Sequence, residues 1–173
     1  MRRSVLAPAV AVVVFSGLLG SVAQAFRNEP DGFRGIAWGT LFAAVQHEMI
    51  LLPGEGWDGT QLYHRKGDKM AVGGTTVQEI AYVFERDIFQ GVMVMTKGRA
   101  NRQAIISAFK TDFGEASQPI ESMDVYYWWG GTTSINLTCQ LLVDECEAII
   151  RSTTGFKRDL LDPIPRSTGA SGS

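Results

Sequence analysis

Few residues in this chain are suited to catalysis or metal binding, and their spacing does not match a known constellation. The two histidines are His47 and His64. His47-Glu48 begins like the helix of a zinc protease, but that site needs a second histidine one turn later, where Leu51 stands. No Gly-x-Ser-x-Gly segment presents a serine nucleophile. We therefore expect no catalytic residue and no metal, with a zinc site shared by the two histidines as the alternative.

Residues 54–59 match the G-x-G-x-x-G pattern of dinucleotide-binding loops. That motif binds a pyrophosphate because a strand precedes it and a helix N-terminus follows it. Here a predicted helix and Pro53 precede the glycines, and no helix is predicted after them. The segment is therefore interpreted as a loop, and no cofactor is expected.

Four carboxylates are the candidates for acid–base chemistry, which needs two of them in one cleft. They are Glu79, Glu85, Asp87 and Asp124. A cell-envelope hydrolase that uses these carboxylates near the aromatic hairpin described below is the alternative function that the sequence leaves open.

Cys139 and Cys146 are predicted to form a disulfide. Apolar and polar residues alternate in the segments around them, as in the two strands of a hairpin. Such a hairpin would place the cysteines opposite each other. Their spacing is neither Cys-x-x-Cys nor that of a zinc knuckle. A structural cross-link is therefore favoured over a redox or metal role.

The strongest local feature is the aromatic run 126–129, which Gly130-Gly131 and a second strand-like segment follow. Paired glycines favour a two-residue hairpin turn. Alternation then places Tyr126 and Trp128 on one face and the other two aromatic rings on the opposite face, among hydroxyl and amide groups. The binding residues predicted on that second face are Tyr127, Trp129, Thr132, Ser134 and Asn136.

Such a surface suits a protein, a peptide or a glycan. The alternative is that the N-terminal or C-terminal segment of the same chain covers it.

The first 25 residues match a secretory signal. Arg2 and Arg3 precede an apolar run, and Ala23 and Ala25 occupy the positions that a signal peptidase reads. We expect cleavage after Ala25 and a periplasmic or secreted location. Retention of this segment as a membrane anchor is the alternative.

The composition fits one globular domain. The chain of 173 residues is 45% hydrophobic and 20% charged, which argues against wholesale disorder. Its net charge is -2, and loss of the two signal arginines would leave -4, which disfavours nucleic acid and anionic lipid as partners. The predicted organisation is a signal peptide at 1–25, a single α+β domain at 26–156 and a disordered tail at 157–173.

Periodicity predicts two helices and several antiparallel strands. One helix is expected over 41–52 with Thr40 as its N-cap, and another from Arg102 to Phe113 with Asn101 as its N-cap. We therefore predict an α+β fold, an antiparallel β-sheet with two helices packed on one face. The expected strands are 33–38, 61–65, 69–72, 76–85, 88–97, 123–129, 132–139 and 146–152.

Strict alternation, with Glu85 opposite Ile88, sorts the hairpin 76–97 into two faces. Two helices cover only one side of a sheet whose two sides both carry apolar residues, so one side is left for a ligand, a partner or a second copy. The face expected beneath the helices contains Ile80, Tyr82, Phe84, Phe89, Met93 and Met95.

Two segments resemble those of a loose group of small exported bacterial proteins of unknown function. Residues 33–40, FRGIAWGT, match the F-x-G-I-x-W-G-T opening of that group, and residues 126–137, YYWWGGTTSINL, resemble its Y-Y-W-x-G-x-T-x-I-x-L pattern with one extra glycine. The resemblance covers roughly residues 33–150. It implies a periplasmic setting and a small α+β domain, and it supplies no catalytic residue.

These patterns together predict an exported envelope protein that binds or interacts without catalysis. The expected partners are an envelope protein, a peptide or a glycan, and a homodimer is equally consistent with the open sheet face. Nucleic acid is not expected, and contact with a membrane is expected only through an uncleaved signal segment.

Overall fold

The computed structural model describes residues 26–53 and 59–154. The predicted signal peptide, the predicted tail and most of the glycine-rich loop at 54–59 lie outside the described residues, and those predictions stay predictions. Within the described ranges, none of the helices has the length and apolar character needed to cross a membrane.

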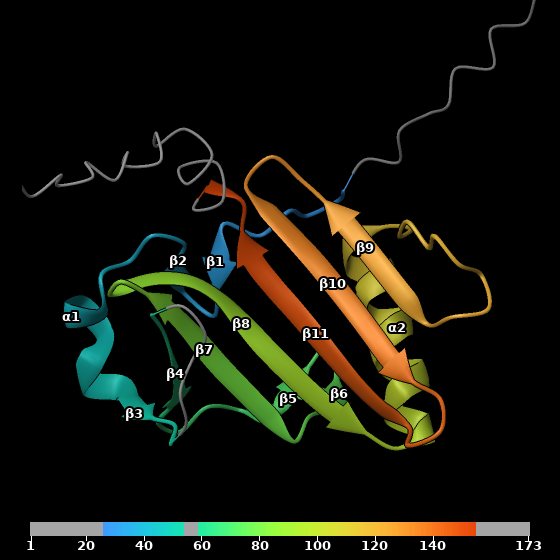
Figure 1. Ribbon diagram of the computed structural model, residues 1–173, viewed down its shortest axis with the longest axis horizontal. Coiled ribbons are helices and arrows are strands. Elements are labelled where there is room, and N and C mark those ends of the chain that lie inside the picture. Colours follow the sequence, from blue (N-terminus) through green and yellow to red (C-terminus); the bar gives the residue numbers. More distant parts are fainter. Residues whose placement is uncertain (1–25, 54–58, 155–173) are drawn as a thin grey trace, which may run out of the picture.

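One seven-stranded antiparallel sheet forms the centre of the molecule (Figure 1). Strands β9, β10 and β11 form a meander, and β11 then pairs with β8, which brings the two halves of the chain into one sheet. In their order across the sheet, the strands are β3 (Met49–Leu51), β4 (Thr60–Arg65), β7 (Glu79–Glu85), β8 (Ile88–Lys97), β11 (Glu145–Ser152), β10 (Thr133–Gln140) and β9 (Val125–Trp129).

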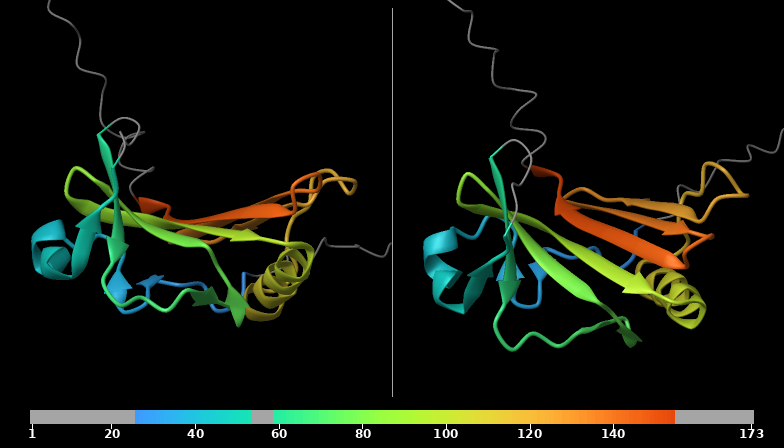
Figure 2. Two further views of the ribbon diagram at one scale, coloured as in Figure 1. Left: turned by 90° about the horizontal axis from the view of Figure 1, so that it is seen from below. Right: turned by 60° about the horizontal axis from the view of Figure 1, so that its bottom comes forward.

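One face of this sheet is covered. The 15-residue helix α2 (Arg99–Phe113) lies beneath it, and Phe109 of that helix packs against Trp128. Two small hairpins lie on the same side (Figure 2), and no described helix covers the other face. The hairpins are β1 (Gly32–Phe33) with β2 (Ile36–Ala37), and β5 (Ala71–Val72) with β6 (Thr75–Thr76).

The predicted α+β fold with two helices on one face is wrong. The structure is β-rich, with 46% strand and 19% helix, and only α2 is a helix of several turns. The first predicted helix is a single turn, α1 (Phe42–Val45), followed by a 3-10 turn, η1 (Gln46–Glu48), and strand β3. Residues 49–51 form a strand and not a helix because pairing with β4 satisfies their backbone hydrogen-bonding groups and buries Met49.

Neither predicted helix cap forms. The Thr40 hydroxyl donates a hydrogen bond backward to the carbonyl oxygen of Ala37, at 2.8 Å. Helix α2 begins at Arg99 after Gly98, and the Asn101 amide donates to the carbonyl oxygen of Lys97. Local side-chain hydrogen bonds of this kind compete with capping.

The predicted strand at 33–38 is a tight hairpin. Arg34 and Gly35 both have positive φ, 49° and 82°, as a two-residue primed turn requires, and Phe33 pairs with Ile36 across it. The hairpin packs its Phe33 ring against Tyr82 of the sheet, with ring centroids 5.8 Å apart.

A β-bulge in the β7–β8 hairpin reverses the predicted faces of β8 beyond it. The pairs nearest the turn match the prediction, but the register shifts between Val83 and Phe84, so Gln90 becomes an extra residue. A single added residue moves every later side chain to the other face. Val92 and Val94 therefore fill the core, and Met93 and Met95 lie on the uncovered face.

The predicted disulfide is present. Cys139 and Cys146 are directly opposite in the β10–β11 hairpin, with Cα atoms 4.0 Å apart. Both residues belong to the core, and the cross-link closes the turn between the strands.

Replacing both cysteines, Cys139→Ala with Cys146→Ala, should lower the free energy of unfolding by about 2.5 kcal/mol, because the open chain gains loop entropy when unfolded. Urea denaturation of the oxidised wild type and the double variant measures the difference. Equal stabilities would contradict the structural role of the cross-link.

Candidate functional site

The uncovered face of the sheet carries three rows of side chains that cross β9, β10, β11, β8 and β7. The rows follow from the pairing register, because directly opposed residues on neighbouring strands share a face. We call this surface the open face. Its rows are Trp129, Ser134, Arg151, Gly91 and Val83; then Tyr127, Asn136, Ile149, Met93 and Ala81; and then Val125, Thr138, Glu147, Met95 and Glu79.

Four of the five predicted binding residues meet in one depression of the open face, about 280 Å³ in volume. Tyr127 and Trp129 form its wall, with ring planes 12° apart and centroids separated by 6.2 Å. Ser134 and Asn136 also line it. Trp129 is 64% exposed, so this aromatic wall faces solvent.

A second depression of about 150 Å³ adjoins the first, and Ile149 and Arg151 line both. It lies where β8 contributes Gly91 to the surface row. A Cβ atom at that position would stand 2.7 Å from the carbonyl oxygen of Ile150, so the close approach of β8 and β11 requires glycine. Sequence reasoning missed this half of the groove because the bulge that exposes it leaves no local pattern.

Arg151 lies between the two depressions and is exposed. Its cross-strand neighbours on the open face are small, Ser134 on one side and Gly91 on the other. Glu85 lines the second depression with Arg151, but the Arg151 side chain has no ion pair or hydrogen bond with any described residue. The open face therefore holds a guanidinium without an internal counter-charge.

Thr132 does not belong to this surface, contrary to the prediction. Trp129 pairs with Ser134, so four residues lie between the last paired positions of β9 and β10, and the predicted two-residue turn is wrong. The Glu29 carboxylate accepts hydrogen bonds from the Thr132 amide and hydroxyl groups, at 2.6 and 2.8 Å, and from the Thr133 amide at 2.7 Å. These contacts hold Thr132 in the turn, away from the groove.

The described N-terminal segment passes on the covered side of the sheet (Figure 2). The indole nitrogen of Trp38 donates to the Thr133 hydroxyl at 2.7 Å, and its ring packs on Phe89, with centroids 5.1 Å apart. Phe26 lines a depression with Tyr127 and Trp129, but Trp129 stays exposed, so the alternative that the N-terminal segment covers this ring is wrong for its described part, residues 26–40.

The other two aromatic residues of the run are core residues, as alternation predicts. Trp128 is 2% exposed, and its indole nitrogen donates to the carbonyl oxygen of Gly114 at 2.8 Å. Tyr126 is also buried, and its hydroxyl donates to Asp124 at 3.1 Å.

The four carboxylates of the hydrolase alternative do not converge. Glu79 and Glu85 stand at opposite ends of β7, roughly 20 Å apart at the usual rise per residue. Asp87 occupies the β7–β8 turn, and Asp124, next to the far edge strand β9, pairs with Arg102 at 3.2 Å. Asp124 and Glu85 line different depressions, so the four carboxylates do not meet in one cleft.

The two histidines contact different carboxylates. His47 lies 3.4 Å from Glu48, and His64 lies 3.5 Å from Glu79 on the rim of the open face. The described residues contain no group of three or more side chains placed to hold a metal ion.

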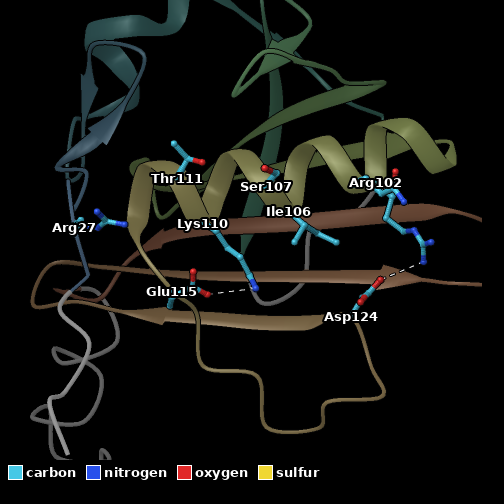
Figure 3. Close-up of a pocket in the computed structure, with 9 residues that line it drawn as sticks. Arg27, Arg102, Ile106, Ser107, Lys110, Thr111, Glu115 and Asp124 are labelled. Atoms are coloured by element: carbon cyan, nitrogen blue, oxygen red, sulfur yellow. Dashed lines mark hydrogen bonds and ion pairs between the residues drawn. The ribbon is translucent and has the colours of Figure 1, made fainter.

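A wider depression of about 820 Å³ lies beside α2 and next to the segment that leads into β9 (Figure 3). Four of its five charged side chains form two ion pairs, and Arg27 has no ion pair with a described residue. Arg102 contacts Asp124 at 3.2 Å, and Lys110 contacts Glu115 at 3.5 Å. The open face is the stronger candidate because it alone of the two combines an exposed aromatic pair with polar groups.

A scan against protein-family models found no match to this chain, and neither did searches of curated proteins and of solved structures. The resemblance drawn from the two sequence segments therefore stays a prediction.

The two neighbouring tryptophans give a direct test of which face is open. Trp128→Ala should lower the free energy of unfolding by about 3–5 kcal/mol, because it empties a core site. Trp129→Ala should cost less than about 1 kcal/mol, because it removes only a stacking contact on an exposed ring. Chemical denaturation measures both, and a large loss for Trp129→Ala would mean that its face is packed.

The Glu29 carboxylate should stabilise the fold at neutral pH, and this stabilisation should be lost as the pH is lowered. Burial alone would raise the pKa of this carboxyl, but the hydrogen bonds from Thr132 and Thr133 outweigh burial and lower it. A carboxyl whose pKa is lower in the folded state stabilises the fold above its unfolded pKa, about 4.3, and this stabilisation is lost as pH falls through the folded value.

The wild type should therefore be more stable than Glu29→Gln at pH 6, and the difference should shrink toward pH 3. Urea denaturation at both pH values measures it. A difference that does not change with pH would contradict the role of the charged carboxylate.

Proposed function

We propose that this protein is an exported envelope protein that binds a ligand or partner on its open face without catalysing a reaction. The observation that carries the proposal is the pair of adjoining depressions, in which Tyr127, Trp129, Ser134 and Asn136 meet on a face that no described helix covers. Exposed aromatic side chains beside polar groups are typical of binding surfaces.

Export is supported by the N-terminal signal pattern. The cross-link between Cys139 and Cys146 is compatible with an oxidising compartment, and such bonds are rare in reducing ones. The disulfide alone does not fix a location, so the signal pattern carries this part of the proposal.

Binding without catalysis is supported by what surrounds the groove. The groups that line it are an aromatic pair, two hydroxyls, two amides, a guanidinium, a carboxylate and apolar side chains. Glu85 is the single carboxylate among its lining residues, so the groove has no carboxylate pair. These groups suit recognition by stacking and hydrogen bonding.

Expression of the full chain in a bacterium tests export. The expected product is a periplasmic protein whose mass corresponds to a chain that begins at Phe26, because Ala23 and Ala25 precede the cut. Cell fractionation and intact-mass measurement check this. A full-length cytoplasmic product would contradict it.

Ligand screening by nuclear magnetic resonance tests the open face. Isotopically labelled mature protein is titrated with sets of peptides and oligosaccharides, and we expect ligands to shift the Trp129 indole and Asn136 amide signals. Trp129→Ala should abolish these shifts, whereas Leu142→Ala, at a fully exposed site in the β10–β11 turn, should not.

Sedimentation of the wild type and the two variants tests whether a second copy of this chain occupies the open face. A dimer that dissociates in Trp129→Ala would identify the occupant as that second copy. Shifts confined to the α2 side, together with a monomer in all variants, would contradict binding on the open face.

A further inference from the structure

We propose that the open face binds a glycan that carries carboxylate groups, with Arg151 contacting a carboxylate and the Tyr127–Trp129 wall stacking on a sugar ring. This inference rests on the proposed function and names the class of ligand. It follows from three features of the groove, which are its charge, its aromatic wall and its hydrogen-bonding groups.

The guanidinium of Arg151 points to an anion, because the one carboxylate of the groove, Glu85, lines only the second depression and is not paired with it. Arg151 lines both depressions and has no ion pair with any described residue. A guanidinium presents a planar fork of donors that matches a carboxylate in two parallel hydrogen bonds. The chain carries a net negative charge, so Arg151 provides a local anion contact and not a broad basic surface that would attract nucleic acid.

The aromatic wall points to a flat ligand surface. Tyr127 and Trp129 are two residues apart on β9, and their rings stack, with planes 12° apart and centroids 6.2 Å apart. The exposed ring of Trp129 presents its face where the C–H side of a sugar ring can stack.

Hydrogen-bonding groups on β10 lie next to the aromatic pair of β9 and complete the site. The Asn136 side-chain oxygen accepts a hydrogen bond from the Thr138 hydroxyl at 3.2 Å, which orients the amide and leaves its NH₂ group as a donor. The Ser134 hydroxyl lies between Trp129 and Arg151 in the same row. Sugar hydroxyls can pair with both groups.

The same arrangement disfavours an extended peptide. Peptides that bind to sheets usually pair with an edge strand through backbone hydrogen bonds. The groove lies on a face, over strands β10, β11 and β8, whose backbone groups are already paired with their neighbours on both sides. Recognition there depends on side chains, which are aromatic on β9 and polar or apolar on β10, β11 and β8.

The test compares oligogalacturonate with its methyl ester, which has the same sugar chain but a masked carboxylate. Calorimetric titration of the mature protein should show binding of the acid at least tenfold tighter than binding of the ester. Arg151→Gln should remove this preference and reduce affinity for the acid to that for the ester. Arg151→Lys, which keeps the charge but loses the planar fork, should fall between the two.

Arg99→Gln is the matched control, because Arg99 is an exposed arginine on α2, away from the open face. It should leave both affinities unchanged, whereas Trp129→Ala should weaken binding of the acid and the ester alike. Circular dichroism confirms that each variant is folded, as expected for exposed positions. An alginate oligomer serves as a second acidic glycan of different linkage.

Equal affinities for acid and ester, no effect of Arg151→Gln, or failure of both acidic glycans to bind at millimolar concentration would each overturn the inference. If peptides or neutral sugars instead shift the Trp129 signal, the glycan inference is wrong and the proposed function stands. If Trp129→Ala changes no binding of any kind, both are wrong.

Discussion

The rest of this structure depends on the alternation of side chains along the strands. Alternation places side chains on both faces of the sheet, but the described chain covers only one of these faces. Helix α2, the two small hairpins and the N-terminal segment all lie on the same side. The buried rings of Tyr82, Phe84, Phe89, Phe109 and Trp128 fill the space between them and the sheet. What faces the other way is a mixed surface of aromatic, polar and apolar groups, and the groove is part of it.

The covered side also positions the groove. Glu29 and Trp38 hold the β9–β10 connection by hydrogen bonds to Thr132 and Thr133. Gly130 leaves room for the Glu29 carboxylate, since a Cβ atom there would overlap it. This connection directly follows Trp129, so contacts made beneath the sheet fix where the exposed indole stands above it. The motif at 33–40 thus acts through packing, with Trp38 as its link to the site.

Where local pattern and long-range pairing agree, the sequence is sufficient. The strands near Trp128 and Trp129 divide their rings between the faces as alternation requires, and the opposed cysteines meet. Where they disagree, pairing decides. The apolar spacing around Met49 fits a helix equally well, and only the presence of β4 as a neighbour makes it a strand.

The bulge at Gln90 and the four-residue turn before Ser134 are similar cases, because each depends on how two strands fit together and on no single residue type. The bulge moved Met93 onto the open face and made Gly91 part of the groove. The turn removed Thr132 from the site. The sequence alone does not indicate Arg151 as a residue of the groove for the same reason. Its place beside Ser134 and Gly91 comes only from the pairing of β10, β11 and β8.

Photochemically induced nuclear polarisation of the mature chain is the most direct measurement, because a dissolved dye polarises only aromatic rings that it can touch. We expect a polarised indole signal from Trp129 and none from its neighbour Trp128, with all residues from 26 to 173 present. An unpolarised Trp129 would mean that another part of the chain, or a second copy, occupies the groove, and the claim of an available binding face would be wrong.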